Sequence, residues 1–190
     1  GSWSSIQSTV ATLAGATGLP PCPSGDTLYS TGSGWACSSD VLDTVLLLHA
    51  DGSDASTAFA DSSFHARSVT VFGDAQIDTA QSKFGGASAL FDGTGDYLRL
   101  ADSADWAFGT GDFTIDFWAR PNGVSGTQCL IGQFNNFGAW EVYRNGATLT
   151  SSISSNDSSF DIASAQTFGT LTTLTWSHIA VVRSGNSFLF

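Results

Sequence analysis

Phe113–Arg120 reads FTIDFWAR, and Trp176–Arg183 reads WSHIAVVR. Both stretches are rich in β-branched and aromatic residues with polar residues interspersed, which is typical of strands in a packed sheet. Turn residues flank the first stretch, since Gly109 to Gly111 precede it and Asn122-Gly123 follow it. The two stretches therefore predict two strands of a β-rich domain.

Eight further runs of the same kind lie within residues 41–190, and clusters of turn residues separate them. They are Thr44–Ala50, Val69–Phe72, Ala87–Phe91, Tyr97–Leu100, Gln128–Gln133, Ala139–Arg144, Ala147–Ile153 and Asn186–Phe190. Asn145-Gly146 predicts a two-residue type I′ hairpin between two of them. Many short strands separated by turns indicate a β-sandwich or jelly roll. If Trp118 or Trp176 fills its core, replacement by alanine should cost about 3–5 kcal/mol.

The composition supports an all-β protein. The chain has 190 residues, and its 14 Phe and 6 Trp can bury a core, which excludes intrinsic disorder. Glu141 is the only Glu and Lys83 the only Lys, so long helix-forming side chains are scarce. The 17 acidic and 6 basic residues give a net charge of −11, which excludes nucleic-acid partners. Membrane insertion is not expected, because no apolar run approaches the ~20 residues of a span.

Residues 1–40 are predicted to be a leader and hairpin that precede a sandwich domain over residues 41–190. The leader carries apolar residues with the a/d spacing of a heptad seam, namely Trp3, Ile6, Val10 and Leu13. This spacing favours a short coiled coil. Two heptads are marginal in water, so a frayed polar leader with accidental spacing is the open alternative.

The end of the leader predicts a short hairpin between Thr27–Ser30 and Trp35–Cys37. A turn midway between these strands places Cys37 opposite Leu28 rather than opposite Cys22. A disulfide between Cys22 and Cys37 would require the PCPSG segment to fold back, so the state of both cysteines stays open.

Three segments resemble elements of the laminin G-like, concanavalin A-like jelly-roll family. Phe91-Asp92-Gly93 with Asp96-Tyr97-Leu98 resembles its strand–turn–strand element, Phe113–Pro121 its long FTIEFWVKP strand, and Trp176–Ala180 its W-x-H-V-A strand. The segments occur in the family's order, and the resemblance implies an all-β jelly-roll β-sandwich. Because the family's strand at this point continues into further strands, the domain is expected to extend beyond Phe190; the alternative is that another chain completes the sandwich.

The resemblance is less specific for function, because this fold serves lectins, adhesion modules, glycosidases and virion tips. Residues 20–37 are similar to short repeats that precede the tips of bacteriophage tail fibres. Together these likenesses imply a non-enzymatic, glycan-binding tip domain of a phage tail fibre or similar virion appendage, located in the virion or outside the cell. Its partners would be a host cell-surface glycan or protein, other virion proteins and two further copies in a parallel homotrimer. The alternatives are a secreted bacterial adhesin or carbohydrate-binding module, and a ligand-free structural decoration domain.

The residues that could carry catalysis are few. Retaining glycosidases of this fold resemble one another in a Glu-x-Asp-x-Glu strand, whereas Glu141 has no acidic residue two positions away. Asp112 and Asp116 share one face of a strand, but solvated outward positions also explain them. His49 and His178 lie in apolar runs and are expected to be hydrogen-bonded core or strand-edge residues. We therefore expect no enzymatic activity.

Aspartates in two loops raise the question of calcium, which prefers carboxylate and carbonyl oxygens. Asp51, Asp54 and Asp61 lie in one connection, and Asp92 and Asp96 bracket a glycine turn. The family resemblance implies a structural calcium at such loops, with Asp51 and Asp61 as the candidate ligands. The alternative is that Asp is a common turn residue, because its side chain bonds to nearby backbone.

One loop and strand combine aromatic and amide side chains, as sugar sites do. Aromatic faces cover the apolar side of a pyranose while polar groups bind its hydroxyls. Asn135, Asn136, Trp140 and Tyr143 are the candidate ligand-binding residues. The alternative is that Trp140 and Phe137 are core residues.

Overall fold

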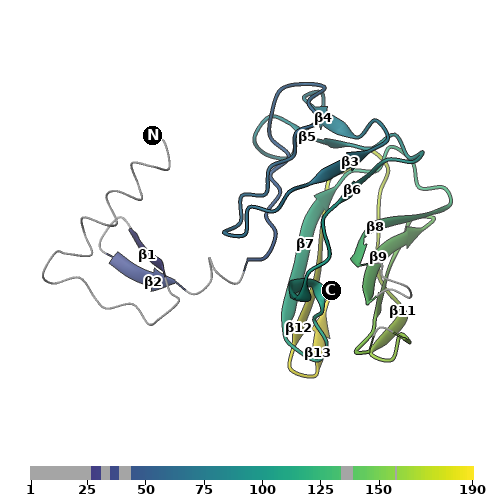
Figure 1. The fold of residues 1–190 in the computed structure, drawn as a ribbon. Coiled ribbons are helices and arrows are strands. Elements are labelled where there is room, and N and C mark those ends of the chain that lie inside the picture. The colour runs from purple at the N-terminus through teal and green to yellow at the C-terminus, as the bar shows by residue number, and fades with distance from the viewer. Residues whose placement is uncertain (1–26, 31–34, 39–43, 134–138, 157) are drawn as a thin grey trace, which may run out of the picture. The chain divides into compact units, whose positions relative to one another are not determined.

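The computed structural model describes residues 27–30, 35–38, 44–133, 139–156 and 158–190 (Figure 1). The described residues form antiparallel strands and one turn of 3-10 helix, η1 (Ala104–Trp106), so the all-β prediction is confirmed. The chain divides into two compact units, residues 1–101 and 102–190. No helix among the described residues is long and apolar enough to cross a membrane.

The first described element of the first unit is a hairpin in which β1 (Thr27–Ser30) pairs antiparallel with β2 (Trp35–Ser38). Leu28 lies opposite Cys37, so the register expected from the sequence is confirmed. The heptad stripe and Cys22 lie outside the described residues, as does the boundary expected at residue 40.

Two short ladders complete the described part of the first unit. In one, β3 (Thr70–Phe72) pairs with β6 (Tyr97–Arg99); in the other, β4 (Gln76–Asp78) pairs with β5 (Ser88–Leu90). Side chains alternate across each strand. The alternation directs one face of each ladder onto a small core whose buried members are Phe59, Ile77 and Ala87.

The second unit contains two antiparallel sheets (Figure 1). The first has the order β13-β12-β7, with β7 at Phe113–Ala119, β12 at Ser177–Ser184 and β13 at Ser187–Leu189. The second has the order β11-β10-β9-β8, with β8 at Thr127–Gln133, β9 at Trp140–Asn145, β10 at Thr148–Ile153 and β11 at Ala163–Thr170.

The two sheets enclose one hydrophobic core, as expected for a β-sandwich. Ile179 and Val181 of β12 are almost fully buried, and so are Val142 and Ile153 of the other sheet. Burial of each such side chain stabilises the fold by about 1.5–3 kcal/mol relative to exposure. The core therefore holds the outer faces of both sheets in fixed positions.

The inward face of β7 is set by this core. Phe113, Ile115 and Phe117 pack into it, and the strand's alternation then turns Trp118 outward, where 38% of the residue is exposed. The possibility that Trp118 fills the core is therefore wrong. Trp176, which precedes β12, is half-buried.

Other expectations also need correction. Thr44–Ala50 is not a strand among the described residues, because it contributes only an isolated bridge between Leu48 and Asp61. The hairpin between β9 and β10 has two loop residues, but they are Gly146 and Ala147, since Asn145 pairs with Thr148. Gly146 has a φ of 60° and Ala147 has no positive φ, which fits a type II′ turn rather than type I′.

Candidate functional site

Asp61, a predicted calcium ligand, is the hydrogen-bonding centre of its loop. The residue is only 9% exposed. Oδ1 accepts from the backbone N–H of Leu47 and of Ser63, and Oδ2 accepts from the Ser63 hydroxyl and the Arg67 backbone N–H, all at 2.8–2.9 Å. Burial alone would raise the pKa of Asp61, but these hydrogen bonds outweigh it and lower the pKa to about 2.

These bonds bear on the calcium hypothesis. A carboxylate offers about four lone-pair sites, and Asp61 uses four of them on donors from Leu47, Ser63 and Arg67. Asp51 is exposed, and a Cβ at Gly85 would lie 2.1 Å from its Oδ1, so its carboxylate lies against that glycine. The geometry of Asp61 favours the turn-residue alternative, and calcium at Asp51 and Asp61 stays a prediction.

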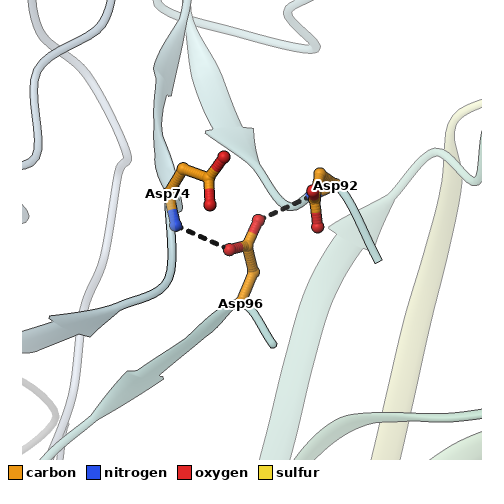
Figure 2. A group of neighbouring side chains, drawn as sticks. All are labelled: Asp74, Asp92 and Asp96. Carbon is orange, nitrogen blue, oxygen red and sulfur yellow. Dashed lines mark hydrogen bonds between the residues drawn. The ribbon is translucent and has the colours of Figure 1, made fainter. Parts of the chain in front are cut away.

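Three aspartates lie together at one end of the β3–β6 ladder. Their proximity was not predicted from the sequence. Oxygens of Asp74, Asp92 and Asp96 lie within 4.8 Å of one another (Figure 2). Asp96 accepts from the backbone N–H of Asp92 at 2.7 Å and of Asp74 at 2.8 Å, and these bonds lower its pKa. The cluster joins two turns, and this structural role needs no ion.

The two predicted sugar-binding residues that the structure describes, Trp140 and Tyr143, do not share one surface. Asn135 and Asn136 lie outside the described residues. Trp140 is 6% exposed, stacks on Phe108 with ring centroids 5.0 Å apart and donates from Nε1 to the Trp106 carbonyl at 2.8 Å. Tyr143 is half-buried and, three positions along the same strand, projects from the opposite face. Trp140 is therefore a core residue, the alternative that the sequence left open.

An aromatic and polar cluster instead lies on the outer face of the β13-β12-β7 sheet. Trp118 of β7 lies directly opposite His178 of β12, with their ring centroids 5.2 Å apart. His178 Nε2 hydrogen-bonds to Asp116 Oδ2 at 3.1 Å, and the two side chains are 45% and 59% exposed. The cluster thus presents an indole, an imidazole and a carboxylate together to solvent.

Part of this cluster was predictable from the sequence. It placed Asp116 outward, and it expected His178 to be hydrogen-bonded; His178 is bonded but exposed, and His49 is exposed outside any strand. The run of large apolar residues at positions 113, 115 and 117 could have shown that Trp118 faces the other way. The cross-strand pairing of Trp118 and His178 has no sequence signal, because it depends on the register between β7 and β12.

The other candidates for catalysis have structural partners. Asp112 accepts a hydrogen bond from the Gly185 backbone N–H at 2.7 Å. Glu141 lies half-buried on β9, in the other sheet from Asp112 and Asp116. Cys129 is exposed and its thiol is not in a disulfide; desolvation by the surrounding protein, together with the negative charge of Glu141, raises the pKa of the thiol to about 11. That thiol stays protonated and unreactive at neutral pH.

Comparison with known protein families gives one match. A laminin G-like family model, described as the concanavalin A-like lectin/glucanases superfamily, matches residues 92–190, slightly more than half of the chain. No curated protein and no solved structure matches the chain. The match covers β6 to β13 and therefore includes both sheets of the sandwich and the Trp118 cluster. The protein thus belongs to the concanavalin A-like lectin/glucanases superfamily.

Proposed function

We propose that this protein is a non-enzymatic glycan-binding domain at the tip of a virion appendage, such as a phage tail fibre. The observation that carries the proposal is the exposed cluster of Trp118, His178 and Asp116 on the outer sheet face. The superfamily includes lectins, which supports a carbohydrate ligand.

The chemistry of this cluster suits a neutral sugar. The indole of Trp118 offers a flat apolar surface for the C–H face of a pyranose. Asp116 accepts hydrogen bonds from hydroxyl groups, and its contact with His178 holds both side chains in place. Both lie on strands that are anchored by the core, so little conformational entropy is lost on binding.

The absence of catalysis is part of the proposal, because the superfamily also includes glucanases. A retaining glycosidase needs two carboxyl groups about 5–5.5 Å apart, and an inverting one about 6.5–9.5 Å, with one of them protonated. In the cluster, Asp116 is bonded to His178, and Asp112, four residues earlier, accepts a hydrogen bond from the Gly185 N–H. This use of both carboxylates in structural contacts supports a binding role over hydrolysis.

Glycan binding by this face can be measured on an array and by calorimetry. We expect Trp118→Ala to weaken binding of the best glycan by at least about tenfold, equivalent to 1.4 kcal/mol. Phe64→Ala is the control, because Phe64 is an exposed aromatic residue (74%) in a loop outside the cluster. Unchanged affinity of Trp118→Ala would exclude this face, and release of reducing sugar that disappears in Asp116→Asn would show a glucanase.

The virion location rests on the leader and its likeness to fibre repeats. A secreted bacterial adhesin or carbohydrate-binding module would bind glycans equally well, and electron microscopy of labelled particles separates these two cases. A ligand-free decoration domain would give no array signal at all.

Self-association is a separate element of the proposal. We expect a parallel homotrimer: self-association would bury the stripe of Trp3, Ile6, Val10 and Leu13, which one isolated helix leaves exposed. The count of three rests on the likeness of residues 20–37 to the repeats of phage tail fibres, because the stripe alone does not favour a trimer over a dimer. Light scattering should give three times the mass of 19.7 kDa, and Ile6→Asp with Val10→Asp should give the single mass. A monomeric wild-type chain would contradict the trimer. A trimer that persists in the double variant would show that the interface lies in the sandwich rather than in the leader.

A further inference from the structure

The few basic side chains of this acidic protein are almost all engaged in structural contacts. Five of the six have partners: Arg67 on the Val45 carbonyl, Lys83 over the Phe84 ring, Arg120 on Asn122, Arg144 on three loop carbonyls, and Arg183 on the Gly109 and Gly185 carbonyls. Arg99 is the sixth. Among the residues that the structure describes, its guanidinium has no hydrogen bond, ion pair or ring contact.

Arg99 is the last residue of β6, which pairs with β3 (Figure 1). Its side chain projects from the face opposite to that of the partly buried Leu98. It is exposed and stands opposite Thr70, and the next outward pair along the ladder is Phe72 and Tyr97. The two rings of that pair are stacked nearly parallel, with their centroids 4.4 Å apart. The outward face therefore combines a cation, a hydroxyl and an aromatic pair on two strands whose inward residues pack into the core.

A shallow cavity of about 350 Å³, wide open to solvent, lies at this face, and Thr70, Phe72, Arg99, Leu100 and Ala101 line it. This volume is at the lower end of the range for small-molecule sites. A guanidinium without protein partners can bind a carboxylate through two parallel hydrogen bonds. Phe72 adds an apolar wall, and the Thr70 hydroxyl can donate or accept.

The charge around the cavity restricts the ligand further. The net charge of −11 disfavours polyanions such as sulfated chains. The cluster of Asp74, Asp92 and Asp96 lies at the Phe72–Tyr97 end of the ladder, away from Arg99. A ligand with a single carboxylate would therefore bind with that group at Arg99 and a neutral, hydroxyl-bearing part toward the aromatic pair.

We propose that the Arg99 cavity is a second binding site, which takes a pyranose with one carboxylate, such as a uronic acid. The site belongs to the first unit and shares no residue with the Trp118 cluster, so it stands without the proposed function. A neutral glycan bound at Trp118 and an acidic sugar bound at Arg99 would be two independent contacts.

The test titrates sodium glucuronate into the isotope-labelled full chain and follows backbone amide shifts by NMR. Glucose and sodium acetate are titrated in parallel, as the sugar without the carboxylate and the carboxylate without the sugar. We expect the shifts to centre on β3 and β6 with a Kd of about 1 mM, a value typical of a small ligand worth about 4 kcal/mol. Glucose and acetate should each bind at least about tenfold more weakly.

Three variants make the test specific for Arg99. Arg99→Gln should lose at least about tenfold in affinity, and Arg99→Lys should recover only part of it, because an ammonium group lacks the planar fork. Lys83→Gln is the matched control, since it removes one positive charge beside an aromatic ring of the same unit and should leave the Kd unchanged. Unperturbed amide spectra of the free variants confirm that they are folded.

The proposal is overturned if Arg99→Gln binds glucuronate as the wild type does, or if Lys83→Gln is weakened equally. It is also overturned if acetate or glucose binds as tightly as glucuronate. Trp118→Ala should leave glucuronate binding unchanged, so loss of neutral-glycan binding and loss of this second site are separate results.

Discussion

Replacing Trp140 with alanine is expected to lower the free energy of unfolding by about 3–5 kcal/mol, as other Trp-to-Ala changes in cores do. Trp140 is 6% exposed and stacks on Phe108, which itself stacks on Phe113 with ring centroids 4.5 Å apart. The change would leave a cavity between the sheets and remove the donor to the Trp106 carbonyl. Urea denaturation measures this loss of stability. If the slope of the unfolding free energy against urea concentration is unchanged, the substitution acts on the folded state rather than on the denatured state.

Trp118→Ala is the matched control for this experiment. The same side chain is removed, but from the exposed face of β7, so the cost should stay below about 1 kcal/mol. Equal losses for the two variants would contradict the strand orientation described for β7 and β9.

Replacing Asp61 with asparagine is the second large effect, with an expected loss of about 2 kcal/mol at neutral pH. The reason is the depressed pKa of this carboxyl group, which moves from its ordinary value of 3.8 to about 2 on folding. Each pKa unit corresponds to about 1.36 kcal/mol. An amide keeps the size of the side chain, but it brings an N–H donor to a site that supplies only donors.

The pH dependence gives this prediction a sign. A group whose pKa is lower in the folded state stabilises the fold above its unfolded pKa and loses that contribution as pH falls through its folded pKa. The difference between wild type and Asp61→Asn should therefore be constant above about pH 4 and shrink toward pH 2. Thermal melts at a series of pH values measure it.

Asp51→Asn separates this explanation from the calcium prediction. If Asp61 stabilises the fold only through its hydrogen bonds within the protein, Asp51→Asn should have the same melting temperature as the wild type. A chelator should then change the melting temperature of neither protein. If both variants lose the same stability and chelation of the wild type reproduces that loss, the two residues share an ion.

Much of the fold was predictable, because alternation and turn residues are local properties. The strands β7 and β12, the β1–β2 register and the family resemblance all follow from patterns of a few consecutive residues. The missed strands lack such a pattern. β4 has a single apolar residue, Ile77, and β11 is mostly exposed at the edge of its sheet.

The sites were less predictable, because their members are distant in sequence. Asp61 receives a hydrogen bond from Leu47, 14 residues away, and Asp96 from Asp74, 22 residues away. Trp118 meets His178 only because β7 pairs with β12 in one register.

Local alternation, turn residues and the many aromatic side chains are enough to predict strands around an aromatic-rich core. The packing of the two sheets against each other sets how completely each strand face is buried. In β7 the apolar residues Phe113, Ile115 and Phe117 mark one face in the sequence, and their packing against the second sheet buries that face and leaves Trp118 outward. In β9 the same sandwich buries Trp140, because one face of that strand must cover the shared core. Burial is a property of two packed sheets, and a single strand's sequence contains only one side of that contact.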